Sequence, residues 1–306
     1  MRMPRPFARV LIALFLLAPG TVDAQARSYE ATLRAGGRQR SYLVDLPPQY
    51  DGRRALPLVI VFHGGGGSGA QARRAYGMSE LGRREGFITV HPDGSARRGV
   101  PLRTWNAGTC CGFAQEQRID ETAFVAALLD SLQARLRIDP ARVYAAGMSN
   151  GGMMAYQAAC ALGGRIAAIG VVAGELTAPD CRPPRPVSVL AIHGTADDHL
   201  PFDGGPGPAS LDPHDTRPVS YAIDTWRRID GCGDTPSVSR SGPVTHTRYA
   251  GCAGGTAVEL YAIQGGGHAW PGADSPRRGR RRRGTPGAGM DATRVLWSFF
   301  QAHPRR

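Results

Sequence analysis

Ser149 lies in the segment Gly147-Met148-Ser149-Asn150-Gly151, between the apolar stretch VYAA and the apolar stretch MMAY. A Gly-x-Ser-x-Gly turn between a strand and a helix is typical of a nucleophilic serine. The turn is so sharp that side chains larger than hydrogen two residues to either side would clash with neighbouring backbone. We therefore expect Ser149 to be a nucleophile, with its hydroxyl exposed at the positive end of the following helix.

A serine hydroxyl is a weak nucleophile at neutral pH and needs a general base. His268 ends the stretch VELYAIQGGGH, and Asp197 and Asp198 end the stretch VLAIHGTADD. The chain order serine, acid, histidine is the order that accompanies this type of turn. We expect His268 to take the Ser149 proton and Asp197 to orient the His268 ring, with Asp198 as the alternative acid.

The segment FHGGGGSG supplies small residues and backbone N–H groups after the first central strand. Such a loop can stabilise the negative charge that develops in the transition state when a serine attacks its substrate. We expect the N–H of Asn150 and one N–H from Gly65 or Gly66 to form this oxyanion hole, and His63 to position the loop. A phosphate-binding role is excluded because no Gly-Lys-Ser/Thr follows and the chain contains no lysine.

The elements that must position these residues alternate along the chain. Apolar and polar residues alternate on either side of Ala35-Gly36-Gly37, and this pattern predicts an antiparallel hairpin. Apolar stretches rich in β-branched residues then predict buried strands, and helical patterns lie between them. The strands are predicted at LPLVIVF, GFITVHP, RVYAAG, IAAIGVV and PVSVLAIHG, and the helices at residues 121–136, 151–162 and 219–229. This alternation predicts an α/β fold with a mostly parallel central sheet and helices on both faces.

The N-terminus has the features of a secretory leader. Three arginines precede an apolar run from Val10 to Leu17, which is too short for a membrane span of about 20 residues. We expect a signal peptide over residues 1–24, with cleavage after residue 26 as the alternative. Residues 27–306 then form a single catalytic domain, secreted or periplasmic and without a stable membrane anchor.

Six cysteines in an exported chain favour disulfides over metal binding, since no Cys-x-x-Cys pair is present. Cys232 and Cys252 are expected to form a local disulfide. The adjacent Cys110 and Cys111 are expected to reach different partners, and the pairing of Cys160 and Cys181 stays open. We expect no metal and no organic cofactor.

The formal net charge is +12, and its positive part is entirely arginine. The densest cluster is SPRRGRRRRG at residues 275–284. We interpret it as a solvated loop, with weak polyanion contact through Arg277–Arg283 as the alternative. It lacks the interleaved aromatic residues of single-stranded nucleic-acid binders, so no nucleic-acid partner is expected.

Several segments together carry a family resemblance: FHGGGGSG, TWNAGTCCG, DPARVYAAGMSNGGMMAYQAAC, IHGTADDHLP, GGGHAWPG and DATRVLWSFFQAHP. They resemble the secreted esterase family of poly(3-hydroxybutyrate) depolymerases and feruloyl esterases, which includes members of carbohydrate esterase family one. The likeness spans residues 29 to 303. It implies the α/β-hydrolase fold and a catalytic triad of Ser149, Asp197 and His268.

The same resemblance implies that the Trp-Asn-Ala-Gly segment, with Trp105 and Asn106, lies near the substrate. Trp270 would line the same cleft, or alternatively pack in the core or at its rim. The arginine-rich segment departs from the family pattern and lies close to His268 in the sequence.

These observations predict a secreted serine carboxylic-ester hydrolase. Its substrates would be feruloyl or acetyl esters on polysaccharide, or short hydroxyalkanoate polyesters and oligomers. One alternative is an acyltransferase or peptidase that uses the same triad, because fold alone does not fix the reaction. The other is a non-catalytic exported protein that binds polyanions, for which an incomplete triad would be the sign.

Overall fold

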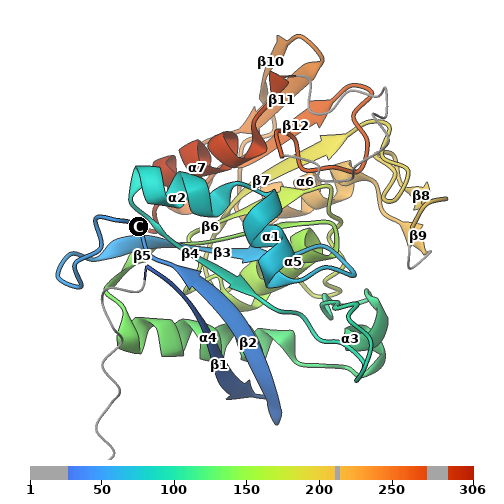
Figure 1. The fold of residues 1–306 in the computed structure, drawn as a ribbon. Coiled ribbons are helices and arrows are strands. Elements are labelled where there is room, and N and C mark those ends of the chain that lie inside the picture. Colours follow the sequence, from blue (N-terminus) through green and yellow to red (C-terminus); the bar gives the residue numbers. More distant parts are fainter. Residues whose placement is uncertain (1–26, 211–213, 274–288) are drawn as a thin grey trace, which may run out of the picture.

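The computed structural model describes residues 27–210, 214–273 and 289–306. Its main feature is a ten-stranded sheet with the order β1-β2-β4-β3-β5-β6-β7-β12-β11-β10 (Figure 1). The expected leader, with either cleavage position, and the arginines from Arg277 to Arg283 lie outside the described residues.

Six strands form the parallel centre of this sheet, and their long apolar stretches are buried because helices cover both faces. They are β3 (Leu56–Phe62), β4 (Ile88–Pro92), β5 (Ile138–Met148), β6 (Ala168–Val172), β7 (Ser188–Gly194) and β12 (Val258–Ile263).

Antiparallel strands extend the sheet at both edges. At one edge β1 (Ser28–Ala35) and β2 (Arg38–Asp45) form the expected N-terminal hairpin. At the other edge β11 (Val244–Tyr249) pairs with β12, and β10 (Ser237–Ser241) is the last strand. A separate two-stranded ribbon joins β8 (Gly205–Pro206) to β9 (Asp215–Thr216).

The helices divide into two layers with separate cores, as alternate residues of β3 show. Leu58, Ile60 and Phe62 pack with the layer of α4, α5 and α6, whereas Val59 and Val61 pack with that of α1, α2 and α7. The helices are α1 (Gly69–Ala75), α2 (Met78–Glu85), α3 (Gly112–Glu116), α4 (Glu121–Arg135), α5 (Asn150–Leu162), α6 (Val219–Ile229) and α7 (Ala292–Ala302), with a 3₁₀ turn at Ala253–Gly255. The predicted α/β architecture is confirmed.

None of the helices in the described ranges combines the length and the apolar character that crossing a membrane requires.

The cysteines form three disulfides, one of which differs from the prediction. Cys232 pairs with Cys252 as expected, and Cys160 pairs with Cys181. The prediction for Cys110 and Cys111 is wrong, because they pair with each other. Their loop folds back on itself, and the Ala107 N–H donates to the Cys110 carbonyl at 2.6 Å. Both cysteines are buried in one small apolar cluster.

Candidate active site

The turn at Ser149 connects the end of β5 to the start of α5. Ser149 has φ 54° and ψ −126°, a left-handed conformation that only a tight turn imposes on serine. A Cβ at Gly147 would overlap the Gly151 carbonyl, and a Cβ at Gly151 would overlap the His63 carbonyl. The glycine spacing therefore has the steric cause that the sequence suggested.

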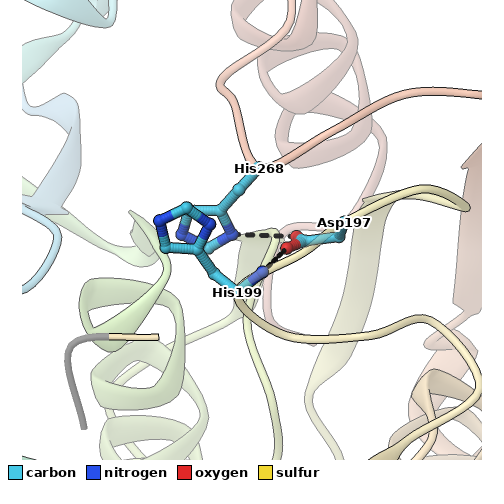
Figure 2. Close-up of side chains that lie close together, drawn as sticks. All are labelled: Asp197, His199 and His268. Carbon is cyan, nitrogen blue, oxygen red and sulfur yellow. Dashed lines mark hydrogen bonds and ion pairs between the residues drawn. The ribbon is translucent and has the colours of Figure 1, made fainter. Parts of the chain in front are cut away.

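His268 and Asp197 approach each other from the loops after β12 and β7 (Figure 2). Nδ1 of His268 lies 2.8 Å from Oδ2 of Asp197. Oδ1 of Asp197 accepts the backbone N–H groups of His199 and Leu200, both at 2.9 Å. Oδ1 of Asp198 instead lies 2.7 Å from Nδ1 of His199. Of the two candidate acids, Asp197 is thus the one that contacts His268.

Asp197 is buried, and burial alone would raise the pKa of its carboxyl group. Hydrogen bonds from His193 and His268, together with the charge of His268 and the Leu200 N–H, outweigh burial and hold that pKa far below its usual range. His193 contributes through Nε2, which lies 3.3 Å from Oδ2 of Asp197. The carboxylate therefore stays ionised at neutral pH.

The glycine-rich loop after β3 lies against the serine turn. A Cβ at Gly64 would be 3.6 Å from Ser149 Cβ, and a Cβ at Gly65 would be 3.6 Å from Asn150 Cβ. The Gly66 N–H donates to the Arg103 carbonyl at 2.8 Å and is therefore occupied. The N–H groups of Gly65 and Asn150 have no acceptor among the residues that the structure describes.

His63 holds this loop, as expected. Its Nε2 accepts the Gly94 N–H at 2.9 Å, so Nδ1 carries the proton and donates to the Gly64 carbonyl at 2.8 Å. Burial lowers the pKa of His63 to about 4, which keeps the ring neutral. A neutral ring with both nitrogens engaged is suited to support and has no free nitrogen for proton transfer.

Trp105 and Asn106 lie behind the serine turn. The Trp105 side chain is fully buried, and its Nε1 donates to the His63 carbonyl at 2.9 Å. Its backbone exchanges two hydrogen bonds with the Asn150 side chain, at 2.7 and 3.0 Å. Asn106 donates to the Ile119 carbonyl at 2.9 Å. Trp105 therefore offers no surface to a substrate and instead supports the loop and the turn.

Trp270 also lies in the core, where its ring stacks on Tyr76 with centroids 4.4 Å apart. Its Nε1 donates to the Thr293 hydroxyl at 2.9 Å. The core-packing alternative describes Trp270 better than a place in the cleft.

His193 and His199 were not singled out by the sequence, although they lie four residues before and two residues after Asp197. Ligand atoms of Asp197, His199 and His268 lie within 4.8 Å of one another, close enough for a metal site. The His199 and His268 rings are nearly parallel, however, so their nitrogen lone pairs do not converge as tetrahedral zinc ligands do. Together with Asp198, these residues are better described as two Asp–His pairs, Asp197 with His268 and Asp198 with His199.

Comparison with known proteins identifies the family. Residues 40–180 match the family described as "Esterase PHB depolymerase". A putative esterase, NocK, from Nocardia uniformis subsp. tsuyamanensis is 30% identical over 301 residues, which cover 90% of this chain and 84% of the relative. Feruloyl esterase B from Piromyces equi is 30% identical over 240 residues, or 75% of this chain, but the match spans only 42% of that longer protein.

The fold has solved counterparts. The acetyl xylan esterase from Aspergillus awamori superposes with a TM-score of 0.61 at 13% identity, covering 90% of this chain and 99% of that structure. This structural likeness shows the fold, whereas the similarity in sequence shows the family. The chain belongs to the esterase PHB depolymerase family, a group of carboxylic-ester hydrolases with the α/β-hydrolase fold.

Proposed function

We propose that the protein is an exported serine esterase in which Ser149, His268 and Asp197 form the catalytic triad. The observation that carries this proposal is the 2.8 Å contact between His268 and Asp197 at the edge of the sheet where the Ser149 turn lies. The amides of Gly65 and Asn150 would form the oxyanion hole, since both are unoccupied and adjacent.

The reaction follows from these roles. His268 Nε2 removes the Ser149 proton as Oγ attacks the ester carbonyl, and the carbonyl oxygen becomes an oxyanion that accepts the Gly65 and Asn150 N–H groups. The intermediate collapses, the alcohol leaves with the proton from His268, and an acyl-serine remains. Water then attacks this ester by the same route, which releases the acid and restores Ser149. Asp197 stabilises the cationic ring in both halves.

We propose esters with an apolar acyl group as substrates: feruloyl or acetyl esters of polysaccharide, or short hydroxyalkanoate oligomers. The loop beside the glycine-rich segment supports this choice. Val100 and Leu102 are 40% and 58% exposed, and Leu102 lies 3.5 Å from the Cβ position of Gly66. The name of the feruloyl esterase relative agrees with such substrates.

Export to an oxidising compartment, secreted or periplasmic, is part of the proposal, with residues 27–306 as one catalytic domain. Three disulfides in the described chain support it, because structural disulfides persist mainly outside the cytosol.

The test compares the purified protein with Ser149→Ala on p-nitrophenyl butyrate and methyl ferulate. Loss of the nucleophile should reduce kcat by a factor of about 10⁴ or more while the unfolding temperature is retained. The ratio of the two rates then reports aliphatic against aromatic acyl preference. Equal activity of Ser149→Ala and the unchanged protein would refute the proposed nucleophile.

A further inference from the structure

A second Asp–His pair lies on top of the first. The His199 and His268 rings are stacked, with centroids 4.4 Å apart and planes 12° from parallel (Figure 2). Asp198 contacts Nδ1 of His199 at 2.7 Å, just as Asp197 contacts Nδ1 of His268 at 2.8 Å. The proposed reaction uses only the pair that contains His268, so the second pair requires its own explanation.

The three glycines before His268 have no side chains that could pack against its ring. Hydrogen bonds anchor their backbone: the Gly266 carbonyl accepts the Ala196 N–H, and the Gly265 N–H donates to the Thr195 hydroxyl, both at 2.9 Å. The Asp197 contact holds one ring nitrogen, but the terminal torsion of histidine is soft, so packing around the ring must restrict rotation about that contact. A flat group against one face of the ring restricts this rotation, and His199 is such a group.

His199 is itself held in place from several sides. Its backbone N–H donates to Asp197 at 2.9 Å, and its ring contacts Asp198. The Ala209 N–H donates to the Asp198 carbonyl at 2.9 Å. Gly207 packs so closely on the His199 carbonyl that any Cβ there would overlap it. These contacts therefore hold the His199 ring in its place against the His268 ring.

We propose that His199 is a positioning residue, which holds the His268 ring in the plane from which it takes the Ser149 proton. The proposal rests on the proposed function of Ser149 and His268.

The test uses His199→Ala, which removes the stack, and His199→Phe, which keeps a flat ring without charge. With p-nitrophenyl butyrate, His199→Ala should lower kcat by about tenfold to a hundredfold with KM changed less than about twofold, because misplacing a catalytic group costs rate. His199→Phe should recover most of kcat.

The matched control is His246→Ala. His246 also stacks on a ring, that of Tyr261 at 4.0 Å, and also contacts a carboxylate, that of Glu259 at 2.9 Å, but it lies on β11. His246→Ala should leave kcat unchanged. Unfolding temperatures of all variants separate a loss of kcat from a loss of fold.

Two results would overturn the inference: an unchanged kcat in His199→Ala, and an equal loss of kcat in His199→Ala and His199→Phe. If His199→Ala does not fold, a tenfold or greater loss of kcat in a folded His199→Phe would overturn it. Failure of the proposed function is distinct, because it would appear as full activity in His268→Ala.

Discussion

At the scale of single residues, Asp197 is the most constrained group of the site. Its carboxylate accepts from His268 and His193 and from the backbone N–H groups of His199 and Leu200. These donors compensate for the burial that would otherwise favour the neutral acid. In the proposed mechanism this contact keeps the proton of His268 on Nδ1 and leaves the Nε2 lone pair to take the Ser149 proton.

Asp197→Asn should therefore remove activity without unfolding the protein. The amide has nearly the same shape but carries no charge and can force the wrong tautomer on His268, which costs about 10⁴ in kcat in serine hydrolases. The measurement is kcat on p-nitrophenyl butyrate at pH 7 to 8, beside Asp198→Asn. The neighbouring variant should lose far less, because Asp198 contacts His199 and not His268. Comparable losses would show that the two acids share the role.

The pair Asp197 and Asp198 also shows what a sequence can and cannot decide. The sequence shows that serine, acid and histidine follow successive strand ends in this order. It does not show in which directions the side chains of two consecutive residues point. One of these carboxyl groups is buried and the other lies at the surface, and this depends on how the loop after β7 packs. Spacing alone therefore could not decide which of the two aspartates contacts His268.

At the scale of elements, the turn at Ser149 could be predicted because its cause is local. Gly147 and Gly151 contact backbone within a few residues or in the adjoining strand. Trp105 was expected near the substrate, and Trp270 either at the cleft or in the core. Both are buried against segments far away in the sequence, where the His63 carbonyl and the Thr293 hydroxyl accept their indole N–H groups. An aromatic residue beside a motif does not reveal which way its ring points.

The loop from Ser95 to Thr104 is the element that we expect to contact the acyl group. It is bridged to the glycine-rich loop between Gly67 and Arg103, and its Leu102 is exposed beside that loop. Leu102→Asp should raise KM for p-nitrophenyl butyrate by about tenfold, since it removes a favourable apolar contact and adds a charge, with little change in kcat. Steady-state kinetics on butyrate and acetate esters measure this effect, which should be smaller for acetate.

Val238→Asp is the control for this prediction. Val238 is 56% exposed, almost as much as Leu102, but it lies on β10 at the far edge of the sheet from the hairpin of β1 and β2. It should leave KM unchanged for both esters. If the two variants behave alike, the loop does not contact the acyl group.

At the scale of the whole molecule, burial shifts the pKa values of histidine and aspartate side chains in opposite directions. These shifts have opposite effects on the stability of the fold as the pH falls. Burial lowers the pKa of both His63 and His91 to about 4, whereas burial raises the pKa of Asp230 to about 6. Below about pH 6.5 the unfolded chain binds more protons at the two histidines than the folded chain does, so these groups weaken the fold as the pH falls. Asp230 has the opposite sign, because below about pH 6 the folded chain takes up a proton there.

Asp230→Asn should therefore make the protein more sensitive to acid. The variant keeps an acceptor for the Val187 N–H, which lies 3.3 Å from Oδ1, but it cannot take up the compensating proton. Between pH 5.5 and 4.5 its free energy of unfolding should fall more steeply than that of the unchanged protein, by about 1 kcal/mol per pH unit. Urea unfolding at intervals of half a pH unit measures the two slopes. Asp224→Asn, an exposed aspartate of α6, should not alter the slope, and parallel curves for Asp230→Asn would contradict the assignment of a raised pKa to Asp230.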